Sequence, residues 1–160
     1  METPQVATEY LILVPVLLMQ IFIFPYAASM LMNTWTESRR TLAIQEAANH
    51  LSSSMQQLYS SVNHDAITAG TVTNKLDLPL SIENYLYTGN ATLRTASSDP
   101  NGSRILEITL KYVGLDISTS VLAIYGGNME WKNSTFQSNF RSASIIAEKQ
   151  SNGTIQMYFG

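Results

Sequence analysis

The sequence predicts an α+β protein, in which a long N-terminal α-helix, hydrophobic and then amphipathic, precedes an antiparallel β-sandwich-like C-terminal domain. Three observations support this. Residues 10–36 carry no charged side chain, apolar residues then recur at helical spacing as far as Val62, and from Ala66 onward short alternating segments are separated by turn residues. We therefore divide the chain into residues 1–64, a hydrophobic helix with an amphipathic stalk, and residues 65–160, a glycosylated β-domain.

The first element is the apolar run YLILVPVLLMQIFIFPYAASMLMNTW, from Tyr10 to Trp35. As a helix it would be about 39 Å long, enough for a hydrocarbon core about 30 Å thick. It is too long for the apolar region of a secretory signal peptide. A buried helix of a soluble domain is the less favoured alternative, because the run is apolar on every face. Pro15 and Pro25 should each bend or locally open the helix, which is tolerable where neighbouring helices cover the freed carbonyls.

The residues ahead of this run read QVATEY over positions 5–10. They resemble the class III signal region of archaeal type IV pilins, Gln-x-Ser-x-Glu-Tyr, which stands where the hydrophobic helix of those proteins begins. Gln5, Glu9 and Tyr10 match this pattern, and Ala7 replaces the serine. The likeness covers roughly the first 60 residues.

The resemblance implies a subunit that is processed by a prepilin peptidase, is assembled by an ATPase-driven machinery and polymerises with identical subunits. The assembly residues it implies are Gln5, Glu9, Tyr10, Pro15 and Pro25. In the family the glutamate is thought to neutralise the terminal amine of a neighbouring subunit, which fits the cost of an unpaired carboxylate in an apolar bundle. The alternative is that Glu9 only lies at the interface and favours the helix N-terminus.

The charges that flank the run have an unusual order, with Glu2 and Glu9 before it and Arg39 and Arg40 after it. By the positive-inside rule this order would place the C-terminal part in the cytoplasm. The family's leader normally ends in a basic and a small residue, and no basic residue precedes Gln5 here. We interpret the chain as already mature, its basic leader having been removed, which also explains the order of the flanking charges.

The second element is an amphipathic continuation of the same helix. No Gly or Pro lies between Tyr26 and Asp65, so we expect one helix from Gln5 to about Asn63, roughly 88 Å long. Its apolar residues form one stripe with 4-3-4-3-4 spacing: Ile44, Ala48, Leu51, Met55, Leu58 and Val62. We expect this stripe to receive the β-domain. A coiled-coil dimer is less favoured, because the stripe lasts fewer than three heptads.

The third element is the β-domain, whose clearest strand is expected at residues 104–113, where apolar and polar residues alternate. Further strands are expected at residues 71–78, 84–87, 92–96, 117–125, 142–148 and 154–159. Turn signals stand at Gly89-Asn90, Asp99–Gly102, Gly126-Gly127 and Asn152-Gly153.

Four Asn-x-Ser/Thr sequons lie in or beside these predicted turns: Asn90, Asn101, Asn133 and Asn152. They predict that the β-domain lies outside the membrane and carries at least one N-linked glycan. The alternative is that turns favour Asn, Ser and Thr in any case.

The sequence shows no catalytic constellation, so we predict a non-enzymatic protein without cofactor or metal. Cysteine is absent, and His50 and His64 are expected to be ordinary polar residues of the helix surface or end. A net charge of −3 with scattered basic residues does not favour a nucleic-acid partner. For the aromatic residues of the β-domain we favour core and subunit contacts over sugar binding: Tyr85, Tyr87, Tyr125, Trp131, Phe136, Phe140, Tyr158 and Phe159.

The predicted function is that of a structural subunit of an extracellular type IV pilus-like filament, inserted in the membrane before assembly, with adhesion or surface attachment as its expected role. One alternative is a single-pass membrane-anchored extracellular binding domain, and another is a minor pilin of a filament or secretion machine. A rotary motility filament is less favoured, because archaellin helices as a family are richer in Gly and Ala and carry larger outer domains.

Overall fold

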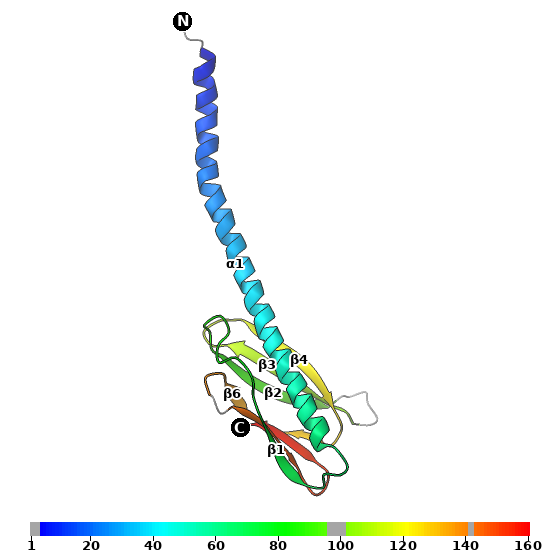
Figure 1. Ribbon diagram of the computed structural model, residues 1–160. Coiled ribbons are helices and arrows are strands. Elements are labelled where there is room, and N and C mark those ends of the chain that lie inside the picture. Colours follow the sequence, from blue (N-terminus) through cyan, green and yellow to red (C-terminus); the bar gives the residue numbers. More distant parts are fainter. Residues whose placement is uncertain (1–3, 96–101, 141–142) are drawn as a thin grey trace. The chain divides into compact units, whose positions relative to one another are not determined.

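The computed structural model describes residues 4–95, 102–140 and 143–160, with side chains described from Leu11 on. It contains one long helix followed by two sheets that are mostly antiparallel, which confirms the predicted α+β fold (Figure 1). The helix α1 spans Pro4–Val62. The strands are β1 (Gly70–Lys75), β2 (Tyr87–Thr95), β3 (Arg104–Tyr112), β4 (Ser118–Tyr125), β5 (Met129–Trp131), β6 (Thr135–Gln137), β7 (Ser144–Lys149) and β8 (Ile155–Phe159).

The chain divides into two compact units, Met1–Arg39 and Arg40–Gly160. The boundary falls inside α1, because the buried side chains of this helix from Ile44 to Val62 belong to the core of the second unit. The sequence-based division at residue 64 follows the change from helix to strand and so lies at a different place. We call residues 11–36 the apolar segment and residues 40–160 the β-unit.

The predicted stripe of the helix forms one side of the core of the β-unit. Ile44, Leu51 and Met55 are completely buried, and so are Ala48 and Val62. The sixth member of the stripe, Leu58, is only 5% exposed. These side chains belong to one cluster with the inward-facing residues of both sheets, which confirms that the stripe receives the β-domain. Each large side chain buried in this way contributes roughly 1.5–3 kcal/mol to folding.

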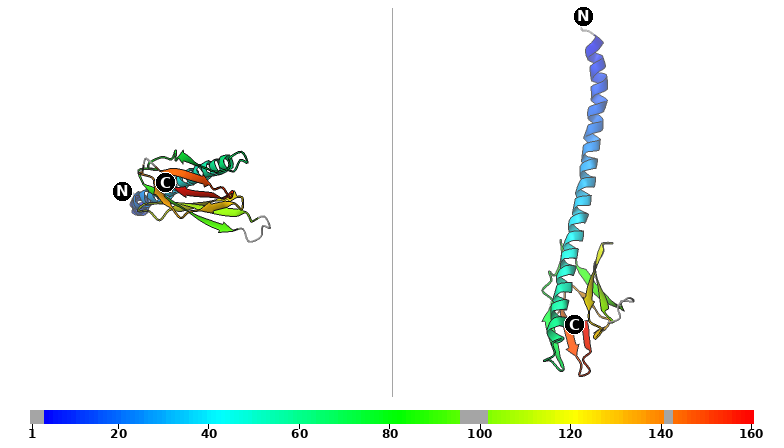
Figure 2. Two further views of the ribbon diagram at one scale, coloured as in Figure 1. Left: turned by 90° about the horizontal axis from the view of Figure 1, so that it is seen from below. Right: turned by 90° about the vertical axis from the view of Figure 1, so that its right-hand side faces the viewer.

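The strands form two four-stranded sheets, in the orders β1-β7-β8-β5 and β4-β3-β2-β6. The parallel pair is β5 with β8, and the other pairs are antiparallel. In β3, Leu106, Ile108 and Leu110 face the core, while Glu107 and Thr109 face outward. The same alternation in β7 and β8 gives each sheet one apolar inner face. Figure 2 shows the two sheets as separate layers with the cyan-to-green end of α1 beside them.

Two sequence-based expectations in this region are wrong, a strand at residues 84–87 and a turn at Gly89-Asn90, whereas the strand expected at residues 92–96 falls within β2 as far as Thr95. Glu83 and Asn84 form a tight turn, with φ angles of 48° and 68°, and the single strand β2 follows it. The predicted turn at Gly89-Asn90 lies inside this strand. A glycine is needed at position 89 because Phe136 of β6 and a leucine of β3 occupy the space that a Cβ would fill.

The other turns follow the sequence more closely. Gly126-Gly127 separates β4 from β5, and Asn152-Gly153 joins β7 to β8, with Gly153 at φ 85°. The predicted turn at residues 99–102 falls largely outside the described residues. The strands β5 and β6 are not predicted by the sequence, because three residues are too few to show an alternation.

Polar contacts fix the end of α1 on the β-unit. The Tyr59 hydroxyl donates to Asn128 Oδ1 at 2.6 Å and accepts the Gly126 N–H at 3.1 Å. The Asn128 side-chain amide donates to Asn63 Oδ1 at 2.9 Å and to the Gly153 carbonyl at 3.1 Å. One asparagine therefore connects the last turn of the helix to two turns of the β-unit, which fixes the helix along its axis.

Two leucines on opposite faces of α1, one buried in the stripe and one exposed, test whether the stripe stabilises the β-unit. Leu51→Ala removes a completely buried side chain and should lower the free energy of unfolding of the β-unit by about 2–5 kcal/mol. Leu42→Ala, at a leucine that is 69% exposed, should change it by no more than about 0.5 kcal/mol. Urea unfolding of the detergent-solubilised full chain, followed by circular dichroism, measures both. Equal losses would show that the stripe does not hold the helix on the sheets.

Candidate assembly surface

The apolar segment exposes its hydrophobic side chains in every direction. Phe22, Ile23 and Phe24 follow one another at about 100° around the helix axis and are 74%, 59% and 68% exposed. Large hydrophobic residues exposed in the segment are Leu11, Ile12, Leu13, Val14, Val16, Leu17, Leu18, Met19, Ile21, Phe22, Ile23, Phe24, Tyr26, Met30, Leu31, Met32 and Trp35. This surface far exceeds the apolar patches that soluble monomers tolerate.

The segment is long and apolar enough to cross a bilayer, and none of the span is buried inside the chain. It is therefore compatible with membrane insertion, either as an anchor or as a signal. Length and composition alone do not separate these roles from burial among other helices.

Four hydroxyl side chains at or just after the end of the segment donate hydrogen bonds within the helix. The hydroxyls of Ser29, Thr34, Thr36 and Ser38 each donate to a backbone carbonyl three or four residues earlier, at 2.8–3.0 Å. A hydroxyl that is already bonded to its own helix costs little when it is moved out of water. These four hydroxyls can therefore be covered by apolar material without being left unpaired.

The helix does not open at either proline, contrary to one part of the expectation, because α1 continues through both Pro15 and Pro25. Proline has no N–H to donate, so the carbonyls of Leu11 and Ile21, four residues earlier, lose their usual helical donor. In a nonaqueous environment such carbonyls need another partner or a neighbouring helix to shield them.

A cation and an aromatic ring meet where the segment ends. The Arg39 guanidinium lies over the Trp35 ring at 4.9 Å from the ring centre. Tryptophan and arginine in this arrangement are typical of the border between an apolar layer and water. The pair thus marks the point at which the apolar surface of α1 stops.

The three residues that carry the pilin resemblance, Gln5, Glu9 and Tyr10, belong to the first turns of α1 by their backbone. Their side chains lie outside the described residues, and so does the sequon residue Asn101. The predicted role of Glu9 in assembly therefore stays a prediction.

The remaining sequon residues are exposed, in three different settings. Asn90 lies in the middle of β2 on the outer face of its sheet, between Thr109 of β3 and Thr135 of β6. Asn133 lies in the link between β5 and β6, and Asn152 lies in the turn between β7 and β8. The Asn152 side-chain oxygen accepts the backbone N–H two residues later at 2.9 Å. All three side chains are open to modification.

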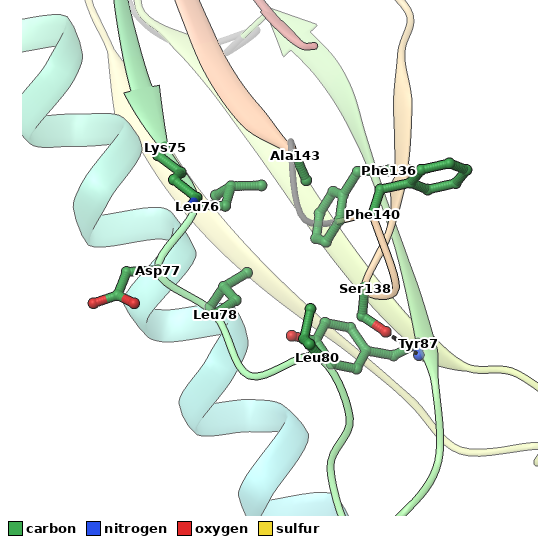
Figure 3. A pocket seen from close by; sticks show the side chains of 10 residues that line it. All are labelled: Lys75, Leu76, Asp77, Leu78, Leu80, Tyr87, Phe136, Ser138, Phe140 and Ala143. Carbon is green, nitrogen blue, oxygen red and sulfur yellow. Dashed lines mark hydrogen bonds between the residues drawn. The ribbon is translucent and has the colours of Figure 1, made fainter.

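A cavity of about 260 Å³ opens between the segment after β1 and the segment after β6 (Figure 3). Leu76, Leu78 and Leu80 line one side, and aromatic rings that include Tyr87 and Phe136 line the other. The Tyr87 hydroxyl donates to a backbone carbonyl, that of Pro79, at 2.6 Å, and burial raises the pKa of Tyr87 to about 12. A phenol held neutral in this way supports the core and is unsuited to proton transfer near neutral pH.

The described residues contain no group of three or more His, Asp or Glu side chains placed to hold a metal ion. His64 lies just after α1, where its ring nitrogen accepts the N–H of Ala66 at 3.2 Å, and His50 is exposed on the helix. Of the aromatic residues singled out in the sequence, Tyr87, Tyr125, Phe136 and Phe159 are buried in the core. Phe140 is 61% exposed.

Comparisons with protein-family models, with curated proteins and with solved structures find no match to this chain. The resemblance to archaeal type IV pilins therefore rests on residues 5–10 and on the apolar segment.

The raised pKa of Tyr87 predicts a loss of stability at high pH. The unfolded chain releases this phenolic proton near pH 10 and the folded chain near pH 12, so stability falls between these values. Tyr87→Phe should lower the free energy of unfolding at pH 9 by about 1 kcal/mol, since it removes one hydrogen bond. The deficit should shrink as the pH rises to 12. Denaturant unfolding at pH 9, 10, 11 and 12 measures this, and parallel curves for the two proteins would contradict it.

Proposed function

We propose that this chain is a structural subunit of an extracellular filament of the type IV pilus kind, which polymerises through α1 and displays the β-unit for adhesion or surface attachment. The observation that carries the proposal is the apolar segment, which is exposed on all sides within the chain. Such a surface leaves water only by entering lipid or by packing among other apolar helices. A filament core made of identical helices covers every face of the segment at once.

Several features favour identical helices over lipid as the final cover. The prolines at 15 and 25 leave carbonyls that neighbouring helices can shield, and a simple anchor has no use for them. The small residues Ala27, Ala28 and Ser29 follow one another, so the backbone can be approached closely from several directions. The QVATEY motif directly ahead of the segment is the sequence feature that resembles pilins.

The resemblance supplies the remaining steps of the proposal. A prepilin peptidase processes the chain, the membrane holds it by the apolar segment, and ATP-driven machinery moves it into the filament. There Glu9 pairs with the terminal amine of a neighbouring subunit. The exposed sequon residues of the β-unit support a location outside the cell.

A single-pass membrane-anchored binding protein is the second candidate. The observation that favours it is that the apolar segment has the length of a bilayer span and ends in the Arg39–Trp35 pair. In this case lipid covers the segment permanently and the β-unit acts as a monomer.

Sheared cell-surface material separates the two candidates. We expect thin fibres that contain the full chain, seen by electron microscopy and identified by mass spectrometry. The double variant Ala27→Leu, Ala28→Leu is more apolar, so it should still insert in the membrane. In a close-packed helix core it should overpack by about 1–3 kcal/mol per site and abolish the fibres.

Met19→Leu is the matched control, because it keeps both volume and polarity at an exposed position of the same segment. This variant should form fibres like the wild type. Recovery of the wild-type chain only as detergent-soluble monomers, with no fibres, would favour the anchor. Fibres from the double variant would contradict the proposal that helices pack closely around Ala27 and Ala28.

The sequons give a separate test of the extracellular location. The intact mass of the native protein should exceed the polypeptide mass by at least one glycan. Among Asn90→Gln, Asn101→Gln, Asn133→Gln and Asn152→Gln, at least one variant should lose that mass, while Asn63→Gln, outside any sequon, should not. A native mass equal to that of the bare polypeptide would contradict the proposed glycosylation.

A further inference from the structure

The sequons of Asn90, Asn133 and Asn152 differ in how far they are built into the sheets. All three asparagines are exposed, so each has room for a glycan. Attaching that glycan is a different matter, because the transferring enzyme must hold the asparagine amide and the hydroxyl two residues later at the same time. Which sequon is used therefore depends on whether the whole three-residue segment can be taken up by an enzyme.

The Asn90 sequon lies entirely inside β2. Figure 1 shows this strand between β3 and β6, and Asn90 is directly opposite Thr109 on one side and Thr135 on the other. The alternate residues of the same stretch face the core, where Tyr87 is completely buried and Ala91 is 7% exposed. Lifting this sequon out of the sheet would break two strand pairings and expose core residues. It therefore needs an opening close to global unfolding.

The Asn133 sequon is fixed at two of its three positions. Its third residue, Thr135, is the first residue of β6 and is paired with β2. The hydroxyl of its middle residue, Ser134, accepts the Phe159 backbone N–H at 2.8 Å and donates to the Lys132 carbonyl at 2.9 Å. An enzyme that takes up this segment has to break both the strand pairing and the Ser134 contacts.

The Asn152 sequon lies wholly in the turn between β7, which ends at Lys149, and β8, which begins at Ile155. The Asn152 side-chain oxygen accepts the Thr154 N–H at 2.9 Å, in an Asx turn that brings the asparagine amide beside the threonine. The residue between them is a glycine, so no side chain covers the segment. The two groups that an enzyme must contact together are thus already adjacent and outside any strand.

We propose that, among these three sequons, Asn152 is the one that a glycosyltransferase modifies on the folded β-unit, whereas Asn90 and Asn133 accept a glycan only before β2 and β6 are paired. This assignment rests on the proposed function, which places the β-unit outside the membrane as a glycosylated domain. It adds the site of modification and its order relative to folding.

The transfer needs a donor in which a sugar is activated by a phosphate leaving group, as in a lipid-linked glycosyl phosphate. The Asn152 amide nitrogen attacks the anomeric carbon, so that a C–N bond forms while the C–O bond to the phosphate breaks. The nitrogen gives up one proton to a base of the transferase, and the phosphate leaves with the electron pair of the broken bond. The chain itself supplies the acceptor nitrogen and its position.

The test uses the full chain as acceptor in a folded and an unfolded form. The wild-type chain is made without glycan in a host that lacks N-glycosylation, and it is purified in detergent. The double variant Leu51→Asp, Leu110→Asp places a carboxylate at two completely buried positions, so its β-unit should stay unfolded. Resistance of the wild-type β-unit to protease, and rapid cleavage of the variant, verify the two states.

Both forms are incubated with solubilised membranes of the source organism, which supply the transferase and its lipid-linked donor, and each sequon is read by peptide mass spectrometry. On the folded chain we expect a glycan at Asn152, with occupancy lower by a factor of about ten or more at Asn90 and Asn133. On the unfolded variant we expect all three to be modified. Thr154→Ala should remove the glycan from the folded chain, and the matched control Thr154→Ser, which keeps the hydroxyl, should retain it.

The outcomes separate this assignment from the proposed function. Modification of Asn90 or Asn133 on the folded chain to the same extent as Asn152 would overturn it. So would a bare Asn152 on the folded chain when the unfolded variant is modified. Either result leaves the glycosylated filament subunit standing. A chain that takes no glycan in either form would overturn both the assignment and the proposed glycosylation, while electron microscopy tests the fibres independently.

Discussion

The removal of apolar surface from water is the constraint on which this structure depends, and α1 meets it in two different ways. Between Ile44 and Val62 the chain supplies its own cover, because the two sheets close over the stripe and bury it completely or nearly so. Between Leu11 and Trp35 the chain supplies none. The first part therefore folds by itself, whereas the second requires another molecule, whether lipid or further copies.

Hydrogen bonds from the strands and turns of the β-unit hold the last part of α1 in place. Asn128 and Tyr59 tie the last turn of α1 to the turns after β4 and β7, and the Tyr112 hydroxyl donates to the Arg40 carbonyl at 3.1 Å. Burial raises the pKa of Tyr59 and Tyr112, as it does for Tyr87, so these phenols stay neutral and act as hydrogen-bonding parts of the core.

The outward surfaces of the β-unit differ in character. In the second sheet, Asn90 and the threonines beside it form a polar face on which a glycan would stand free of the core. Leu122 and Ile124 interrupt that polar face at its edge. The outer face of this sheet is therefore polar around Asn90 and apolar at its β4 edge.

The sequence by itself determined the features whose signal is local. These features are the uncharged run, the 4-3-4 spacing of the stripe and the alternation in β3. Each depends only on residues that are close together in the sequence of one helix or strand. The sequons are also evident from the sequence. The setting of Asn90 is not, because the pair Gly89-Asn90 is typical of a turn. Only the structure shows that Phe136 occupies the space beside this glycine. Only the tertiary structure decided that β4 ends its sheet and that residues 77–82 form a groove with α1. In sequence, Val121 to Ile124 reads as an ordinary buried strand. Strand neighbours are set by contacts between distant residues, which no local pattern records.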